Sequence, residues 1–368
     1  MVRVALAAVL GAATLFAHHE LRAEFDEQKP VTLKGIVTRF EWNNPHALLH
    51  IDVGDANWAI EWASPLELRN TGWSRDGLNV GDVVTVEGWP ARDGSKLAAA
   101  KTVTLASGMK LMEPPDVETL PRAKSNPMPR WPDGHPRLGI GPGESGYWAS
   151  PSAASLVETA AGNIRMDRNG LLANVADAGR MAPFQPWAKG LYEYRQRVLL
   201  KDDPMLACLP PAGPRMFQAA HGVQFLEQPD RKRMFVMSGG GNRNWRLIYL
   251  DGRALPQNED VTPTYWGYSS GHWDGDTLVV ESDAFNERFW FSNGGLPHTE
   301  NLRLTERFSR PDFNTLRYEV TINDPGAYTR PWSSAWTLHW MAGQEIQEYF
   351  CQDNPKDEPH MAGPGRPK

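Results

Sequence analysis

Hydrophobic and polar positions alternate along two long stretches of the chain, and Gly, Pro, Asn or Asp residues separate the alternating segments. Such alternation is typical of β-strands in sheets with one buried face. Between residues 31 and 105 it predicts five strands, and residues 64–78, between the third and the fourth, begin with a helical pattern. Five strands with a helix in this position indicate an OB-like barrel.

The second alternating stretch, residues 182–354, contains nine strand candidates at short spacing. Asp274 and Gly275 separate two of them and predict a hairpin with a type I′ turn, which needs positive φ at both central residues. Successive hairpins predict an antiparallel, lipocalin-like up-and-down barrel, because a meander must protect its edge strands. A strongly curved open sheet or a sandwich is the alternative. A short helix after a proline leads into these strands and carries on one face Trp187, Leu191 and Tyr194.

Residues 110–181 are rich in Pro and Gly, and no period extends through them. We expect them to form a linker, or a strap that is laid over a domain and docked through Trp131 and Trp148. The predicted fold class is therefore all-β. The predicted parts are a signal peptide (1–17), an OB-like domain (18–109), the linker or strap (110–181), the antiparallel barrel (182–354) and a disordered tail (355–368).

The first residues have the pattern of an export signal. Arg3 precedes an apolar run from Val4 to Ala17, which is too short to span a bilayer and has the length of a signal-peptide core. Cleavage is expected after Ala17, with cleavage after Ala23 or an uncleaved anchor as alternatives. The mature chain, with no other apolar run long enough to cross a membrane, is predicted to be periplasmic or secreted.

Composition narrows the function classes. The net charge of −6 gives no basic footprint for a nucleic-acid partner. The two cysteines, Cys208 and Cys351, are predicted to form a disulfide because the expected compartment is oxidising, and two free buried thiols are the alternative. No dinucleotide-binding, haem-attachment or Cys-x-x-Cys motif occurs, so we expect no redox cofactor.

Two sets of motifs resemble exported bacterial families. "HHELRAEF", "LKG" and "WNNPH" resemble a family of unknown function, the domain-of-unknown-function 6152 type, over about residues 18–106. "DDPMLACLPPAGPR", "IYLDGR", "GHWDGDTLVV" and "LTERFSRPDFNTLRYEVTINDPGAYTRPW" resemble a second uncharacterised family over about residues 183–353; "QAAHG" departs from it, since an aromatic residue is expected near His221. These resemblances imply compartment and domain layout, and neither implies a reaction.

Several strands of the second barrel mix Trp, Tyr and Leu with occasional polar residues on one face. A mostly apolar barrel interior with a few polar groups describes a pocket for a small hydrophobic or aromatic molecule. The alternative is that the aromatic side chains simply fill the core. The candidate ligand-binding residues are Trp245, Arg246, Trp273, Asn286, Trp290, Asn293 and Trp336.

A loop at the mouth of such a pocket would also carry chemistry. His298 or His272 beside Glu287 or Glu306 would make an acid–base pair, suited to a cofactor-free lyase, isomerase or hydrolase. A non-catalytic envelope binding or interaction module is the alternative from another class.

A third hypothesis is a copper-binding protein. Cleavage after Ala17 would make His18 the N-terminal residue with His19 beside it, and His46 could join them, since amine and imidazole nitrogens suit copper.

Overall fold

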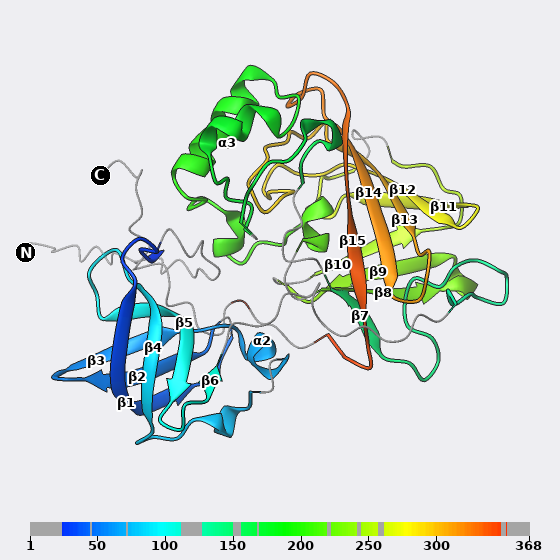
Figure 1. Ribbon diagram of the computed structural model, residues 1–368. Helices are drawn as coiled ribbons and strands as arrows, with labels where there is room; N and C mark the ends of the chain where they lie inside the picture. The colour runs from blue at the N-terminus through cyan, green and yellow to red at the C-terminus, as the bar shows by residue number, and fades with distance from the viewer. Residues whose placement is uncertain are drawn as a thin grey trace, which may run out of the picture.

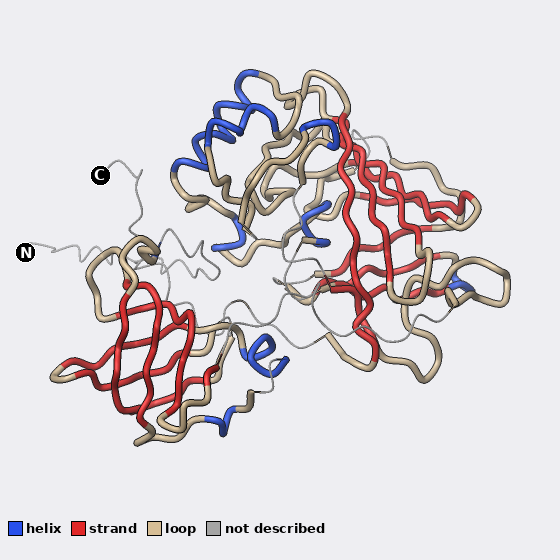
Figure 2. The backbone as a smooth tube through the Cα atoms, viewed as in Figure 1, coloured by secondary structure: helices blue, strands red, loops and turns tan. Residues whose placement is uncertain are grey.

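The computed structural model describes residues 24–44, 46–70, 73–111, 127–149, 156–167, 169–218, 222–240, 244–256, 261–346 and residue 351. It confirms the all-β class: the chain forms two barrels, and the helices between the described strands are short (Figures 1 and 2). No helix among the described residues has both the length and the hydropathy needed to span a membrane. The predicted signal peptide, His18, His19 and the predicted tail lie outside the described residues.

The N-terminal barrel has the predicted order of strands. They are β1 (Val31–Glu41), β2 (Leu48–Val53), β3 (Ala56–Glu61), β4 (Val83–Pro90) and β5 (Leu97–Leu105), with α2 (Pro65–Asn70) and the 3-10 helix η1 (Arg75–Gly77) between β3 and β4. β1 pairs with β2 and β4, and a parallel β3–β5 pairing closes the barrel. A short strand, β6 (Lys110–Leu111), extends β5. Gly88 allows β4 to approach β5 closely, because a Cβ there would lie 1.9 Å from the carbonyl oxygen of Ala99.

The C-terminal barrel is closed by nine strands, which confirms the predicted barrel. Its members are β7 (Gly146–Ala149), β8 (Val223–Gln228), β9 (Arg233–Ser238), β10 (Trp245–Tyr249), β11 (Tyr268–Asp274), β12 (Thr277–Asp283), β13 (Arg303–Ser309), β14 (Thr315–Asn323) and β15 (Trp332–Ala342). All neighbours pair antiparallel except β10 and β11, which are parallel. The predicted linker supplies β7, which lies between β15 and β8 and is too short to show a period. The last predicted strand, around residues 345–353, falls largely outside the described residues.

The β11–β12 hairpin is present, but its turn differs from the prediction. Asp274 pairs with Thr277, so the central residues are Gly275 and Asp276. Only Gly275 of these two has a positive φ, of 58°. A glycine at the first central position is the pattern of a type II′ turn rather than type I′.

Loops and short helices cover both ends of the C-terminal barrel. At one end the strap bonds to Glu227, whose carboxylate accepts from the backbone N–H of Leu138 and Gly139 and from the Trp131 indole. At the other end lie the β12–β13 loop and helix α3 (Pro186–Arg197), the predicted helix, which has Pro186 as its first residue. The other 3-10 helices of the described residues are η3 (Thr159–Ala161), η4 (Val175–Arg180), η5 (Pro204–Leu206), η6 (Gly213–Phe217) and η7 (Pro229–Arg231).

Helix α3 buries an unexpected face. Its buried residues are Ala188, Tyr192 and Gln196, whereas Trp187 and Tyr194 on the apolar stripe are 47% and 41% exposed. The Gln196 amide fixes this face, since it donates to the carbonyls of residues 170 and 294 and accepts from the backbone N–H of residue 172.

Candidate functional site

The interior of the C-terminal barrel contains a buried ion pair between Arg246 on β10 and Glu306 on β13. Arg246 donates from Nη1 to Oε1 of Glu306 at 3.0 Å and from Nη2 to Oε2. It also donates to the hydroxyls of Ser269 at 2.9 Å and Ser282 at 2.6 Å, while Tyr318 donates to Glu306 at 2.8 Å. Two predicted site residues are therefore brought together, but they bond to each other and to neighbouring side chains of the barrel wall.

Aromatic rings occupy the space beside this ion pair. Phe217, contributed by η6, lies 4.5 Å from Tyr318 and 5.3 Å from Phe308 between ring centroids. Trp336 packs on Tyr318 at 4.8 Å and donates its indole N–H to the carbonyl of Phe217. These contacts correspond to the core-filling alternative for Trp336. A hydrophobic ligand inside the barrel stays a prediction, and it would have to displace these rings.

The β12–β13 loop packs its aromatic residues inward, so their large apolar rings are not left in contact with water. Phe289, Trp290 and Phe291 are 2%, 4% and 0% exposed. The imidazole of His298 lies between two backbone carbonyls of this loop region, with Nε2 2.9 Å from the oxygen of Phe289 and Nδ1 3.2 Å from that of Thr299. Burial lowers the pKa of His298, so we assign a neutral ring that donates from Nε2 along the shorter contact.

The structure does not bring the predicted acid–base pairs together. The described partners of His298 are backbone carbonyls and rings, while Glu287 is exposed on the loop. His272 is exposed on the outward side of β11, and Glu306 is completely buried within the barrel. The cofactor-free chemistry predicted for these four residues therefore gains no geometric support.

An arginine pair that the sequence analysis missed flanks Trp290. The guanidinium of Arg195 lies 4.5 Å and that of Arg215 6.0 Å from the Trp290 ring. Arg215 forms a bidentate pair with Asp203 and donates to Oδ1 of Asn293 at 3.2 Å. Burial lowers the pKa of Arg195 to about 10. The sequence signal for the Arg215–Asp203 ion pair lay in "DDPMLACLPPAGPR", which contains both residues.

The predicted ligand residues of this loop have local partners. Asn293 accepts from Arg215, and its backbone N–H donates to Oε1 of Gln218 at 3.0 Å. Asn286 accepts from the backbone N–H of Arg288 at 3.0 Å, which fixes the turn that begins the loop. These hydrogen bonds, which stabilise the loop, account for the positions of Asn286 and Asn293.

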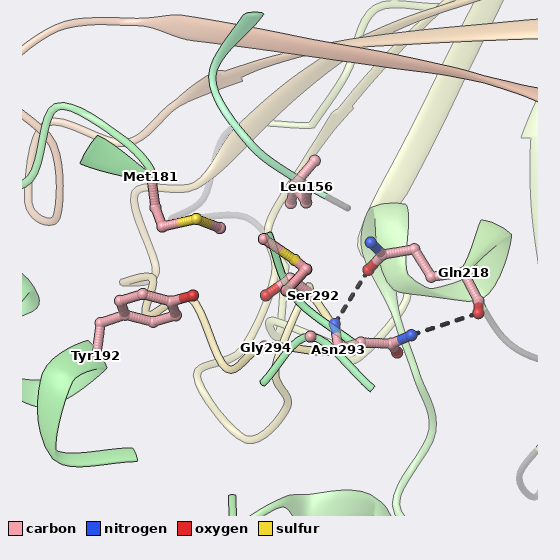
Figure 3. A pocket seen from close by; sticks show the side chains of 9 residues that line it. Leu156, Met181, Tyr192, Gln218, Ser292, Asn293 and Gly294 are labelled. Atoms are coloured by element: carbon pink, nitrogen blue, oxygen red, sulfur yellow. Dashed lines mark hydrogen bonds between the residues drawn. The ribbon is translucent and has the colours of Figure 1, made fainter. Parts of the chain in front are cut away.

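A small cavity of about 10 Å³ lies between this loop and α3 (Figure 3). It offers the space of about one water molecule. The hydroxyl of Tyr192 points toward it and has no hydrogen-bond partner among the described residues, and burial raises the pKa of this hydroxyl. The lining residues are Leu156, Met166, Gly170, Met181, Tyr192, Gln218, Ser292, Asn293 and Gly294.

The two remaining predicted ligand residues, Trp273 and Trp245, do not line one pocket together. Trp273, at the end of β11, stacks on His135 of the strap with ring centroids 5.1 Å apart. Trp245 is on the outside of the barrel and 53% exposed, while its neighbour Arg246 points inward. Successive side chains of a strand point to opposite faces, so these two neighbours could not both line the interior. The placement of Trp245 in an interior pocket was wrong.

Trp245 is part of an apolar surface on the outside of β8, β9 and β10, which lie side by side in Figure 1. We call this surface the outer aromatic face and define it by nine outward positions, six of them apolar. They are Gln224, Leu226 and Gln228 on β8, Arg233, Phe235 and Met237 on β9, and Trp245, Leu247 and Tyr249 on β10.

The outer surface of β13 and β14, on the same barrel, is polar instead. The nine outward positions of β13 and β14 include no apolar side chain; they are Arg303, Thr305, Arg307, Ser309, Thr315, Arg317, Glu319, Thr321 and Asn323. The outer aromatic face is therefore a local feature and not a general property of the barrel exterior.

In the N-terminal barrel, His46 contacts a buried glutamate. Its Nδ1 lies 3.1 Å from Oε1 of Glu61, and Nε2 of His50 lies 2.8 Å from Oε1 of Glu41. Among the described residues, no three His, Cys, Asp or Glu side chains lie together as a metal site. The copper hypothesis stays a prediction, because His18 and His19 are outside those residues.

Cys208 and Cys351 form the predicted disulfide, with Cα atoms 5.8 Å apart. The bond joins the loop after η5 to the segment that follows β15. Cys208 has a positive φ of 56°, as do Leu199 and Leu200 nearby in the chain at 56° and 57°. Residues other than glycine rarely adopt a positive φ, so the disulfide and the packing of this segment hold a strained backbone.

Fold and geometry thus define a two-barrel, all-β protein with a filled C-terminal barrel. Residues 5–100 match the model of a family of unknown function (DUF6152). The match covers most of the N-terminal barrel and confirms the resemblance inferred from its motifs. No curated protein matches the chain.

Proposed function

We propose that the chain is a non-catalytic binding module of the cell envelope, and that its outer aromatic face is the surface that binds a protein partner. The observation that carries this proposal is the contrast between two sets of nine outward positions on one barrel. Six are apolar on β8–β10 and none on β13–β14.

Apolar side chains that cluster at the surface are unfavourable in water unless something covers them. On this face two of the six are exposed and the other four are half-buried. Trp245 and Met237, which pair directly across β9 and β10, are 53% and 37% exposed. Trp, Tyr, Phe, Met and Arg are the residues enriched in protein interfaces, and all five types occur on this surface. The packed interior supports the same conclusion, since the barrel then serves as a rigid support.

The location in the envelope is part of the proposal. The N-terminal Arg3 and the apolar run after it have the pattern of an export signal, and the Cys208–Cys351 disulfide is compatible with an oxidising compartment.

Site-specific photo-cross-linking in the native envelope tests the proposal. A benzophenone amino acid replaces Trp245 in one variant and Arg317, on the polar outside of β14, in a matched control. We expect a discrete protein adduct from position 245 and none from position 317. Equal labelling at both positions, or no protein adduct at 245, would overturn the proposal.

A further inference from the structure

We infer that the partner segment bound by the outer aromatic face is acidic; this inference rests on the proposed function and adds the chemistry of the partner. One end of the face is basic. The β8–β9 turn carries Arg231 and Lys232, which are exposed, and Arg233 follows at the start of β9. Within the described part of the chain, none of these three has a carboxylate within 4.0 Å.

The cations on the outward positions of β13 and β14 are paired, in contrast to those of the β8–β9 turn. Arg303, Arg307 and Arg317, on the polar outside of β13 and β14, each lie within 4.0 Å of a carboxylate. The β8–β9 turn beside the outer aromatic face therefore differs from the polar outside of β13 and β14 in having cations without carboxylate partners.

The charges at this end do not cancel. Arg253 forms an ion pair with Asp251, which leaves Arg231, Lys232 and Arg233 against Asp230 on the turn, three positive charges and one negative, or +2. The nearby carboxylate of Glu227, which is bonded to the strap, reduces this balance to +1. The whole chain carries −6. A basic patch on an acidic protein attracts acidic partners and repels basic ones, which gives specificity and speeds association.

One of the unpaired arginines is also held in place. Arg233 lies over the ring of Phe235 at 5.4 Å, and its Nε donates to Gln228 at 2.7 Å. A guanidinium group fixed on a ring loses little freedom when it binds a carboxylate. Arg233 is therefore already oriented for an acidic ligand.

The arrangement specifies the spacing of the partner's groups. Arg233 pairs with Tyr249 at the basic end, and Met237 pairs with Trp245 at the apolar end. These rows are four residues apart along β9, or about 13 Å at 3.3 Å per residue. The matching segment places an apolar side chain on Trp245 and carboxylates about 13 Å away.

Charge reversal in the full-length chain, with the cross-linker at position 245, tests this inference. The variant R231E/K232E is compared with K34E/K101E, which makes the same change in net charge at exposed lysines of the other barrel. We expect adduct yield to fall about tenfold in the first variant and to stay unchanged in the second. Yield from the unreversed chain should fall as salt is raised, because exposed charges are screened.

The identity of the cross-linked peptide provides a second readout. With the cross-linker moved to position 232, mass spectrometry should find it attached beside Asp or Glu residues of another protein. Attachment to a neutral or basic segment, to a lipid or to a second copy of this chain would overturn the inference. So would an adduct at position 245 whose yield does not respond to R231E/K232E. That last result leaves the proposed function standing, whereas no adduct at 245 removes both.

Discussion

Arg246 and Glu306 meet in the centre of the C-terminal barrel although two strands lie between them. Arg246 reaches across the inner faces of β11 and β12, where Ser269 and Ser282 accept two of its hydrogen bonds. The side chains are 2% and 0% exposed. Burying two charges is tolerated only when each satisfies the other, and removal of one leaves an uncompensated charge in the interior.

Loss of one partner of this pair should be strongly destabilising. We expect Arg246→Met or Glu306→Leu to lower the free energy of unfolding of the barrel by about 3–5 kcal/mol. The double variant should cost much less than the sum of the two, because no unpaired charge remains. Urea unfolding measures all three. Arg307→Gln, which breaks the exposed pair with Asp274, is the control and should cost less than about 1 kcal/mol. Additive losses in the double variant would contradict a coupled pair.

Two of the buried tyrosines, Tyr192 and Tyr318, should respond differently to loss of the hydroxyl. Tyr318→Phe removes the hydrogen bond to buried Glu306 and should cost about 1–3 kcal/mol. Tyr192→Phe removes a hydroxyl without a described partner and should change stability by less than about 0.5 kcal/mol. Each variant is the other's control, since both rings are buried and lose the same atom. Equal losses in urea unfolding would indicate a partner for the Tyr192 hydroxyl.

Strand alternation in the sequence predicted the two barrels, because each strand buries one face against a core. It missed β7, since four residues, 146–149, contain too few alternations to separate a strand from an extended strap. The pairing that makes this segment a strand involves residues of β15 nearly 200 positions away. Cys208 and Cys351, by contrast, could be paired from the sequence, because the chain has only two cysteines and its N-terminal pattern predicts an oxidising compartment.

Which face of β10 points inward could not be predicted locally. The more apolar face of β10 is formed by Trp245, Leu247 and Tyr249. Hydrophobicity alone predicts that this face points toward the core. The structure turns it outward, and the face with Arg246 points inward. The charge of Arg246 is balanced by Glu306, 60 residues further along the chain. A long-range pair therefore decides the orientation of the strand, and with it the existence of the outer aromatic face.

Protonation of His298 should couple stability to pH. Burial lowers its pKa below the ordinary value of 6.5, so the folded protein keeps the ring neutral at pH values where the unfolded chain already binds a proton. Above about pH 6.5 the residue has no effect on the pH dependence of stability. As the pH falls below 6.5 toward the lowered pKa, the free energy of unfolding should drop by up to about 1.4 kcal/mol per pH unit.

The variant His298→Asn isolates this contribution. Unfolding curves collected from pH 8 to pH 5 should show a smaller loss of stability for the variant than for the native chain, with the difference confined to the acidic side of 6.5. An identical pH dependence in both proteins would mean that the pKa of His298 is not lowered in the fold.

The Cys208–Cys351 disulfide should stabilise the C-terminal barrel by restricting the unfolded chain. The bond closes a loop with a sequence separation of 143 residues, and loss of a native disulfide typically costs about 2–5 kcal/mol. We expect Cys208→Ser/Cys351→Ser to lower the free energy of unfolding by this amount, as measured by urea unfolding. Reductant should lower the stability of the native chain to that of the double variant and leave the variant unchanged. A native chain that keeps its full stability after complete reduction would show that packing alone holds the strained segment between Leu199 and Cys208.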